Sequence, residues 1–579
     1  MSVTLTLNDA YKKVTDDQDK IITPEETVRI FKEKAANINL EILESTMRID
    51  NGRLDIPVFF SVCGKDAQKV TGTNKQMGKG ATPSQSEASA VMELAERFSF
   101  FSFKNNQKNF FTDTYRNVGD KAMPFELIAK SVHDHNVDEI EHVREFFMNL
   151  PFQWTEAYNL TRKKSMLVPF DWFFMINEFN GPSAGNCKEE AICQGISEIV
   201  ERHVSSLVSM GKRAVPLIDP WTSPDPLVRE MLTKYEKAGI RLVVSDFTLD
   251  TGIPTVAVLG WDPSTFPESS ELVWTAGTAP DPHKALSRAL TEVAQLAGDF
   301  NSKSNYVASG LPKFKALAET DYITNVEKTL TMQDLPDLSD PNIRVEIERY
   351  VSTLEERGFE VFLIDTAHEG LAIPAFYTII PGAHFRERAT GTSVGMFTAK
   401  FITENLDTRE ALSRLKSMAE KLPGAYYIQF YLGQLYLSLE RHEQALDYFK
   451  KAMSLNPQEQ DIPSICSYTG VCLKDMERYE EALAILEKGA EKDNEREDIF
   501  NLMGFCHFKL KNHEQAIECF KRVIALNPSS AIDYANIASN YRDMGQPDKA
   551  ISYYTLALTL DSSLDFARDN LDKLRNNAE

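Results

Sequence analysis

The chain has 579 residues, a formal net charge of −22, and 42% hydrophobic and 26% charged residues. A chain of this length exceeds what one hydrophobic core usually supports, so we expect at least two globular domains. The negative charge argues against nucleic acid or an anionic membrane surface as a principal partner.

We expect a cytoplasmic protein, because no targeting signal is indicated and the cysteines are typical of reduced thiols. The start of the chain lacks a basic stretch followed by an apolar run, and no window approaches about 18 uncharged apolar residues, so we expect neither a signal peptide nor a membrane span. The seven cysteines form no CxxC pair, which is typical of reduced thiols. Cys187 and Cys193 lie on an acidic helix, but no motif specifies a histidine partner, so a catalytic thiol is the weaker interpretation.

The first strand, turn and helix follow an N-terminal helix. Residues 1–20 are polar and expected to be irregular, and the capping pattern Thr23-Pro24-Glu25-Glu26 predicts a helix that ends near Ala36. Strand-like runs follow at 54–63 and 68–73. Gly78-Lys79-Gly80 then turns the chain into a helix that carries Ser89, Glu93 and Glu96 on one face, followed by Arg97.

A second unit repeats this arrangement. The apolar run 165–177 indicates a buried strand region, and 181–186 forms the turn before the next helix. That helix carries Glu190, Gln194, Ser197 and Glu201 on one stripe, with Glu198 at its border. The phrases Glu93-Leu-Ala-Glu96-Arg97 and Glu198-Ile-Val-Glu201-Arg202 follow Gly80 and Gly185 at the same interval, which indicates that the two helices are related.

A third unit contributes a cation. Strands are predicted at 241–245 and 255–259, and the run 272–280 leads into a helix with the pattern Arg288-x3-Glu292-x2-Gln295. Arg288 takes the place that Ser89 holds in the first unit, and glutamine replaces the second glutamate. Three related β-turn-α units therefore build this part of the chain.

The acidic stripes allow two interpretations. A single Glu-x-x-Glu usually marks a solvated helix face, which would make this a structural protein. If the two stripes face each other, repulsion among four or five carboxylates requires a multivalent cation, and oxygen ligands without histidine or cysteine suit Mg²⁺ rather than zinc.

Phosphate-binding features accompany the stripes. Polar turns that open helices bind anions through unpaired N–H groups, and Lys79 adds a full charge. Neither the GxxxxGK[ST] loop nor a GxGxxG motif after a strand is present. The residues alone therefore favour a Mg²⁺-dependent nucleotide- or phosphate-binding domain outside the common nucleotide folds.

The remainder of this half is less regular. Residues 321–353 are expected to form an exposed helical region, and 360–365 and 373–380 two more strands. We expect the first domain, 1–399, to end in an irregular segment. A linking region, 400–425, contains a predicted helix at 409–422.

The C-terminal residues, 426–579, show a period of about 34 residues that is typical of tetratricopeptide repeats. Small residues such as Gly433, Gly470, Gly504 and Ala538 alternate with large ones such as Phe449, Leu486, Phe520 and Tyr554. We expect about four repeats and a closing helix near 565–574. Such arrays usually present a groove to a protein, although this one could instead pack against its own N-terminal domain or a second subunit.

Residues 20–395 resemble the YcaO family of ATP-dependent amide-activating enzymes. The likeness rests on four motifs: Gly-Lys79-Gly-Ala-Thr; Ser89-x3-Glu93-x2-Glu96-Arg97; Ser-Ala-Gly-Asn186-x3-Glu190-x3-Gln194-x3-Glu198-x2-Glu201-Arg202; and Arg288-x3-Glu292-x2-Gln295. The resemblance implies an α/β, YcaO-type ATP-binding domain built from repeated β-turn-α units, here followed by an all-α tetratricopeptide-repeat solenoid.

Carried over by position, the resemblance assigns a metal set and a nucleotide set. Mg²⁺ would be held by Glu93, Glu96, Glu190, Glu198 and Glu201. ATP would be contacted by Lys20, Thr27, Lys79, Ser89, Arg97, Asn186, Gln194, Arg202 and Arg288. Thr27 stands where serine is familiar in the family. No catalytic residue beyond these sets is assigned.

Members of the family are understood to phosphorylate a peptide-bond oxygen, so that a nucleophile can replace it to give azolines, thioamides or amidines. Azoline-forming members resemble one another in a proline-rich chain end, which this chain lacks. The helical tail looks like that of members associated with methylthiolation of a ribosomal protein. We therefore expect an enzyme acting on a protein or peptide, with repeats that recruit the substrate or a partner enzyme, and a homodimer is compatible with both features. The alternative is an adaptor whose nucleotide site is regulatory or degenerate.

Overall fold

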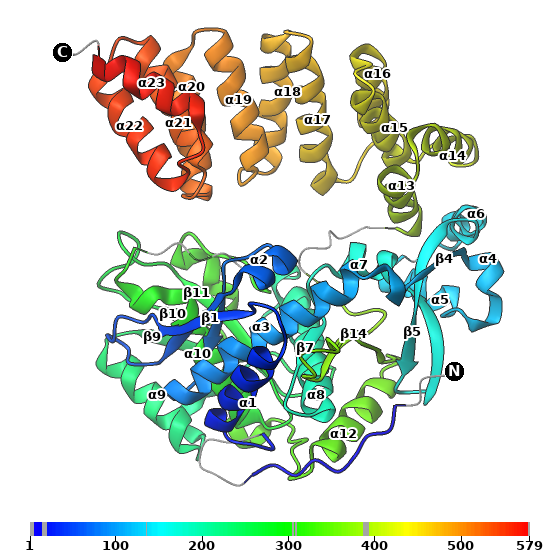
Figure 1. Cartoon of the computed structure of the whole chain (residues 1–579), viewed down its shortest axis with the longest axis vertical. Helices are drawn as coiled ribbons and strands as arrows, with labels where there is room; N and C mark the ends of the chain where they lie inside the picture. The colour runs from blue at the N-terminus through cyan, green and yellow to red at the C-terminus, as the bar shows by residue number, and fades with distance from the viewer. Residues whose placement is uncertain are drawn as a thin grey trace. The chain divides into compact units, whose positions relative to one another are not determined.

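The computed structural model describes residues 5–13, 20–134, 136–303, 306, 310–385 and 393–576. Contacts divide the chain into two compact units, Met1–His133 with Asn149–Arg388, and Asp134–Met148 with Ala389–Glu579. Figure 1 shows sheets and helices in the first unit and helices in the second, which confirms the predicted fold class. Within the described residues, the helices are all too short or too polar to cross a lipid bilayer.

The first sheet of the first unit supports the first acidic helix. It has three antiparallel strands in the order β1 (Leu43–Arg48), β2 (Val58–Cys63) and β3 (Lys75–Lys79). Helices α1 (Pro24–Asn37) and α3 (Pro83–Asn105) pack together, and α3 lies on β2 and β3. Thr23 caps α1 through a capping box with Glu26, as the sequence predicts.

A six-stranded sheet supports the second acidic helix. Its order is β4 (Phe111–Thr114), β5 (Pro151–Asn159), β13 (Phe362–Asp365), β14 (Ala375–Ile379) and β7 (Pro182–Ala184), with β6 (Lys164–Pro169) paired to β5. Helix α8 (Lys188–Met210) packs on β7 and β14, and α12 (Ile343–Glu355) packs on α8. The apolar side of α8, including Ile192, Ile196 and Ile199, is buried in this core.

A five-stranded sheet supports the third helix. Its order is β11 (Val273–Thr278), β10 (Thr255–Trp261), β9 (Arg241–Asp246), β8 (Leu217–Asp219) and β12 (Thr329–Thr331), with only the last pair parallel. Helix α10 (Pro282–Ala297) covers β10 and β11, and α9 (Pro226–Lys237) packs on α10. Shorter helices of this unit are α2 (Lys65–Thr71), α4 (Tyr115–Val118), α5 (Phe125–Ser131), α7 (Phe170–Asn177) and α11 (Asp321–Thr324).

A missing side chain at one position brings each strand close to its helix. A Cβ on Gly78 of β3 would lie 2.1 Å from the Ala90 nitrogen of α3, and one on Gly277 of β11 would lie 2.7 Å from the Ala289 nitrogen of α10. In the second β-turn-α unit the glycine lies on the helix instead. A Cβ on Gly195 of α8 would lie 2.7 Å from Ser183 Oγ of β7. In each β-turn-α unit a glycine therefore allows the helix and its sheet to approach closely.

An N-terminal segment, residues 5–13, is tied to the starts of α8 and α12. Asn8 N–H donates to Glu189 Oε1 at 2.7 Å, and Ile343 N–H donates to the carbonyl oxygen of Ala10 at 2.9 Å. Lys12 pairs with Glu346 at 2.5 Å. Residues 1–4 and 14–19, which belong to the region expected to be irregular, lie outside the described residues.

The second unit is an array of antiparallel helix pairs. Its helices are α13 (Val394–Asn405), α14 (Thr408–Lys421), α15 (Tyr426–Ser438), α16 (His442–Ser454), α17 (Ile462–Asp475), α18 (Tyr479–Lys492), α19 (Glu497–Lys509), α20 (His513–Leu526), α21 (Ala531–Asp543), α22 (Pro547–Leu560) and α23 (Asp565–Asn576). In each pair a small residue faces a large one: a Cβ on Gly433 would lie 2.5 Å from the Phe449 ring, and one on Gly504 would lie 2.7 Å from the Phe520 ring.

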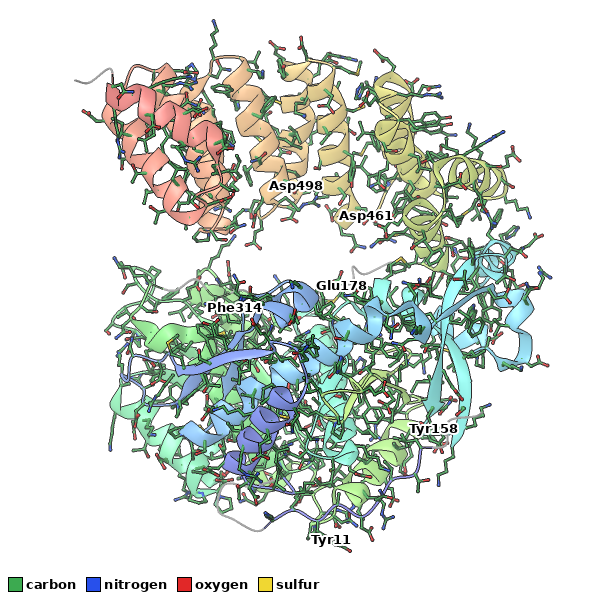
Figure 2. All side chains as sticks on the ribbon, in the orientation of Figure 1. Tyr11, Tyr158, Glu178, Phe314, Asp461 and Asp498 are labelled. Carbon is green, nitrogen blue, oxygen red and sulfur yellow. The ribbon has the colours of Figure 1, made fainter. Side chains whose placement is uncertain are left out.

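Polar contacts join neighbouring repeats. Asp498 of α19, labelled in Figure 2, accepts from Ser467 Oγ of α17 at 2.6 Å and pairs with Arg496 at 2.8 Å. Asn501 of α19 donates to Asp533 of α21 at 2.7 Å. These contacts and the packed helices give the repeat architecture that the sequence predicts.

Helix α6 (Val137–Met148) belongs to the second unit although its sequence lies within the first half of the chain. It packs on α13 and α14, and Glu139 Oε1 accepts a hydrogen bond from Tyr427 Oη of α15 at 2.5 Å. The domain limits expected from the sequence, 1–399, 400–425 and 426–579, place α6 and the start of α13 with the first domain. Sequence periodicity can indicate a helix such as α6, but it does not show which other helices pack on it. The domain limits therefore stay a prediction.

Four local expectations are wrong. Residues 68–73 form the end of α2 and its C-cap rather than a strand, because Gly72 adopts φ 71° and closes a helical turn. The run 165–177 divides into β6 and α7, since periodicity does not separate a buried strand from a buried helix. Residues 321–353 hold α11, β12 and part of α12, and the end of the predicted 1–399 domain contains the start of α13. The predicted helix 409–422 is confirmed as α14.

Candidate active site

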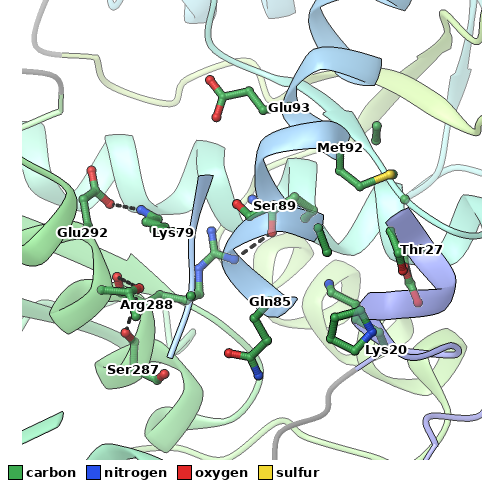
Figure 3. Close-up of a pocket in the computed structure, with 18 of the residues that line it drawn as sticks. Lys20, Thr27, Lys79, Gln85, Ser89, Met92, Glu93, Ser287, Arg288 and Glu292 are labelled. Atoms are coloured by element: carbon green, nitrogen blue, oxygen red, sulfur yellow. Dashed lines mark hydrogen bonds and ion pairs between the residues drawn. The ribbon is translucent and has the colours of Figure 1, made fainter. Parts of the chain in front are cut away.

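One large pocket lies where α1, β3, α3, α8 and α10 meet (Figure 3). Its volume is about 530 Å³, within the range of small-molecule sites in proteins. All fourteen residues of the predicted metal and nucleotide sets line it. The structure thus brings the two acidic stripes together across one cavity, while the binding role of each residue stays a prediction.

An acidic group is formed by Glu93 and Glu96 of α3 and Glu198 of α8. Arg97 Nε lies 3.5 Å from Glu96 Oε1, and Arg97 Nη2 lies 3.9 Å from Glu93 Oε1. Burial raises the pKa of Glu93 and raises that of Glu96 further, with Arg97 opposing both shifts and Glu198 adding to them. Burial therefore disfavours the charged form of these carboxylates, and a cation that binds here would stabilise that form.

Glu201 lies deeper in the same pocket. Its Oε2 accepts from Thr278 N–H at 3.1 Å, at the end of β11. Burial, and next the nearby Glu292, raise the pKa of Glu201 to about 7 against the opposing effect of Arg202, Arg288 and Lys79. Near neutral pH this group consequently changes charge easily.

A cationic group is formed by Lys79, Arg202 and Arg288, one from each of β3, α8 and α10. Figure 3 shows the Lys79 ammonium paired with the Glu292 carboxylate. Arg288 Nη1 donates to Gln194 Oε1 at 2.9 Å, and Arg202 Nη2 lies 3.9 Å from Glu198 Oε1. Burial alone would raise the pKa of Glu292, but Lys79, then Arg202 and Arg288, hold it below its ordinary value.

The opposite side of the pocket in Figure 3 is formed by the N-terminal residues Lys20 and Thr27. Thr27 Oγ1 donates to the carbonyl oxygen of Thr23 at 3.0 Å, and its side chain is largely buried. Glu190 ties this segment to α8, because Glu190 Oε1 accepts from Ile21 N–H at 2.7 Å and its Oε2 accepts from both nitrogens of Asn186 at 2.9 Å.

The donor set fits a triphosphate with Mg²⁺. Formal charges on the lining balance, since Lys20, Lys79, Arg97, Lys284, Arg202 and Arg288 face Glu93, Glu96, Glu190, Glu198, Glu201 and Glu292. Arg288 Nε is a buried donor for which the described residues provide no acceptor. Across the described residues, no three acidic, histidine or cysteine side chains form a ready-made ion site. Mg²⁺ is usually held by one or two carboxylates together with substrate phosphates, and the pocket offers the carboxylates and the cations that would bind such phosphates.

Several lining residues were not assigned a role from the sequence. Glu292 and Gln295 belong to the third repeat of the motif and line the pocket, as do Gln85, Lys284 and Ser287. The pattern Arg288-x3-Glu292-x2-Gln295 identifies Glu292 as the counterpart of Glu93. The pairing of Glu292 with Lys79 depends on how the first and third β-turn-α units contact each other, and motif spacing does not predict that contact.

The family comparison agrees with this site. The family model described as YcaO cyclodehydratase, ATP- and Mg²⁺-binding, matches residues 77–384, more than half of the chain. The chain therefore belongs to the YcaO family, which confirms the resemblance, and ATP and Mg²⁺ are the cofactors described for that family. In the second unit, residues 430–534 match the repeat domain of cytochrome c-type biogenesis protein H, and 534–564 match a tetratricopeptide repeat.

Individual relatives match different shares of the chain. An uncharacterized protein of Methanothermobacter thermautotrophicus is 28% identical over 382 residues, which cover 62% of this chain and 94% of that protein. The ribosomal protein S12 methylthiotransferase accessory factor YcaO of Escherichia coli is 28% identical over 136 residues, which cover 23% of this chain and 22% of that factor. The structure of YcaO from Methanopyrus kandleri bound with AMPPCP and Mg²⁺ has a TM-score of 0.50 at 21% identity. The match covers 65% of this chain and 95% of that chain, which supports the fold.

Proposed function

We propose that the protein is an ATP- and Mg²⁺-dependent enzyme that activates a backbone amide of a protein or peptide by phosphorylation. The observation that carries this proposal is the single pocket in which carboxylates and cations from three β-turn-α units face each other. Amide oxygen is a poor leaving group, and bound ATP would supply the phosphoryl group that makes it a good one, with Mg²⁺ offsetting the charge of the transfer.

The chain's own residues divide this work between two parts of the pocket. Glu93, Glu96, Glu190, Glu198 and Glu201 would hold the metal, and their burial strengthens their attraction for it. Lys79, Arg202 and Arg288 would hold phosphate oxygens, together with Lys20, Thr27, Ser89, Arg97, Asn186 and Gln194 around the remainder of the nucleotide.

The repeats would supply the substrate or a partner modification enzyme. Repeat arrays present an extended surface built from successive helices, and the second unit has this construction. The product depends on the nucleophile that replaces the activated oxygen, and a role as accessory factor in ribosomal protein methylthiolation, or in thioamidation, is the finer proposal. The E. coli accessory factor supports it over the short region that it shares with this chain.

The test is ATP consumption that depends on the correct peptide. We expect ADP release by the full chain to rise when a substrate peptide is added and to require Mg²⁺. Mass spectrometry of the proteome with and without this protein should then show a single-site exchange of oxygen for sulfur, loss of water or methylthiolation. Absence of nucleotide binding by the purified chain in the presence of Mg²⁺ would overturn the proposal.

A second candidate is an adaptor with a regulatory or degenerate nucleotide site. The observation that favours it is the size of the helical unit, which has its own buried core. Substituting both Glu93 and Glu198 by glutamine separates the two. Cellular function that persists in this variant after nucleotide binding is lost would support the adaptor and reject the enzyme.

A further inference from the structure

An exposed group of aromatic rings lies at the C-terminal end of α3. This aromatic patch consists of Phe101 of α3, Phe174 of α7 and Phe179, which lies in the turn after α7. The centroid of the Phe179 ring lies 5.8 Å from that of Phe101 and 6.3 Å from that of Phe174, and Phe179 is 50% exposed. Single exposed apolar side chains are common on protein surfaces, whereas a contiguous group of them usually marks a binding surface.

The backbone holds Phe179 at the surface. Helix α7 ends at Asn177, and β7 begins at Pro182. Between them Glu178, which is labelled in Figure 2, adopts φ 50° and ψ −116°. A positive φ at a residue other than glycine costs free energy, and proteins retain such residues mainly at functional sites. The turn therefore presents Phe179 at a conformational cost.

Two elements connect the aromatic patch with the pocket. Along α3, Arg97 lines the pocket, and Phe101 follows one turn later, about 6 Å further along the helix axis. Phe179 precedes β7, whose last residue, Ala184, also lines the pocket, and β7 packs on α3. The Arg97 side chain is 24% exposed, so the pocket is open on this side. Because an extended chain advances about 3.3 Å per residue, a peptide bond beside Arg97 has neighbours about two or three residues away that reach the patch.

Lys104 determines which kind of side chain fits the aromatic patch. Its ammonium lies 4.1 Å from the ring centre of Phe174 and 6.0 Å from that of Phe101. Within the described parts of the chain, no carboxylate pairs with Lys104. A second cation would be repelled here, and a carboxylate would leave the rings uncovered. An uncharged aromatic ring instead contacts the rings and attracts the ammonium to its face.

We propose that the aromatic patch binds an aromatic side chain of the substrate peptide, about two or three residues from the amide that is activated. This inference rests on the proposed function. The peptide bond is the same in every protein, so selection of one amide requires contacts with neighbouring side chains. Phe101, Phe174 and Phe179 supply such a contact on the side where the pocket opens at Arg97. The substrate class is therefore a peptide with an aromatic residue near the modified position.

The first experiment measures peptide binding to the full chain by saturation-transfer NMR of the peptide, which detects weak binding. The probe is an acetylated, amidated polyglycine peptide with one central phenylalanine. The wild type should bind it about fivefold or more tighter than the same peptide with alanine, and Phe179→Ala should remove this preference. Phe505→Ala is the matched control, because Phe505 is 36% exposed on α19 with Lys474 and Lys509 each 5.4 Å from its ring. Its preference should stay within about twofold of the wild type, and loss of the preference in Phe505→Ala alone would overturn the proposal in favour of the array.

The chemistry of the bound side chain is tested with further peptides. Cyclohexylalanine has about the size of phenylalanine but no aromatic face, so the wild type should bind it about threefold more weakly, and Lys104→Gln should bind both peptides equally. Peptides with arginine or glutamate in place of phenylalanine should bind more weakly than the phenylalanine peptide. Tighter binding of either charged peptide, or equal binding of the two uncharged rings by the wild type, would overturn the aromatic preference.

The position of the bound peptide is tested with AMPPCP and Mn²⁺, which accepts the same oxygen ligands as Mg²⁺ and broadens the NMR signals of nearby protons. The ring signals of the phenylalanine peptide should broaden in the wild type and not in Phe179→Ala. Peptide binding without broadening would overturn the link between the aromatic patch and the pocket.

The remaining outcomes separate this proposal from the proposed function. A wild type that binds AMPPCP with Mn²⁺ but shows no preference for the phenylalanine peptide would reject only the role of the aromatic patch. A wild type that prefers the peptide but does not bind the nucleotide would reject the proposed function. Light scattering gives the molar mass of the wild type and Phe179→Ala, which should agree. A smaller mass for the variant would assign the patch to contact with a second copy of the chain and overturn the proposal.

Discussion

The carboxylates of the pocket are buried, whereas Glu459 and Glu481 of the repeat array lie at the surface, paired with Lys492 and Arg478. Burial raises the pKa of Glu93, Glu96 and Glu201 in the pocket. In the array a hydrogen bond from Arg478 lowers the pKa of Glu481, and one from Lys492 lowers that of Glu459. A site that keeps like charges out of water stores unfavourable energy, which a ligand can relieve, while an array stabilised by packing does not.

The largest expected effect comes from the array. Phe449→Ala removes a fully buried ring that packs against Gly433, so the helical unit should lose about 3–5 kcal/mol of unfolding free energy. Chemical denaturation and limited proteolysis measure this loss. Tyr468→Ala, at a side chain 37% exposed on α17, is the milder control. The pocket and the array are expected to be stabilised independently, so ATP with Mg²⁺ should still raise the melting temperature of the first unit in this variant. Loss of that increase would show that the two regions are coupled.

The pocket should respond in the opposite sense. In the double variant Glu93→Gln and Glu198→Gln, several kcal/mol of charge stabilisation are lost, so ATP turnover should fall by about 10²-fold or more. The ligand-free protein should melt at the same or a higher temperature, because two repelling buried charges are gone. Turnover assays and thermal melting check the two halves of this prediction. A lower melting temperature without ligand would contradict the idea that the pocket opposes stability.

The spacing between α8 and its sheet should matter to both properties. Gly195→Ala would place a Cβ 2.3 Å from Thr378 Oγ1, so we expect a loss of about 1–3 kcal/mol in stability. A shift of α8 also moves Glu198 and Glu201, and binding of ATP with Mg²⁺ should weaken by about tenfold. Adding Thr378→Ala, which removes Oγ1, should restore part of both losses. Failure of this second substitution to restore either one would show that the close approach is not the cause.

The smallest effect is on pH dependence. Burial raises the pKa of Glu201 to about 7 and that of Asp171 to about 7, above their ordinary values of 4.5 and 3.8. An acid whose folded-state pKa is raised gives stability that is present at low pH and lost as pH rises through the folded value. Lowering the pH from 8 to 6.5 should therefore stabilise the ligand-free first unit.

The array offers the contrast for this measurement. Its exposed acids with lowered pKa, such as Glu481, lose their contribution only below about 4.5, so the second unit should be nearly indifferent between pH 8 and 6.5. Below 6.5 His203 opposes the gain in the first unit, because burial lowers its pKa to about 4. Melting curves of wild type, Glu201→Gln and Asp171→Asn test this. An unchanged slope in both variants would show that neither acid is the source.

Sequence spacing indicated which residues line the pocket, although it missed parts of the fold around it. The repeated glutamates could be found because a helix places Glu93 and Glu96 on one face and the chain repeats the phrase at Glu198 and Glu201. The same local rules give the capped helix α1 and the repeats. They do not give the contact between Lys79 and Glu292, since these residues lie on separate units that meet only in the folded chain.

Local signals also misled where context decides. Gly64 and Gly72 cap the two ends of α2, although the helix contains β-branched residues that favour a strand. Pro169 ends β6 and begins α7 within one apolar run, so hydrophobicity alone showed no boundary. Both outcomes depend on backbone geometry at single residues rather than on periodicity over a window.

The placement of α6 limits how this protein can be dissected. Its residues Val143 and Phe147 are fully buried, and the helices that pack on it, α13 and α14, come from sequence far downstream. A recombinant fragment that stops at residue 384, the end of the family-matching segment, would expose the apolar face of α6, because α13 and α14 would be missing. A soluble minimal version should instead run through Lys421, and a graft of the repeats onto another protein would have to bring α6 with it.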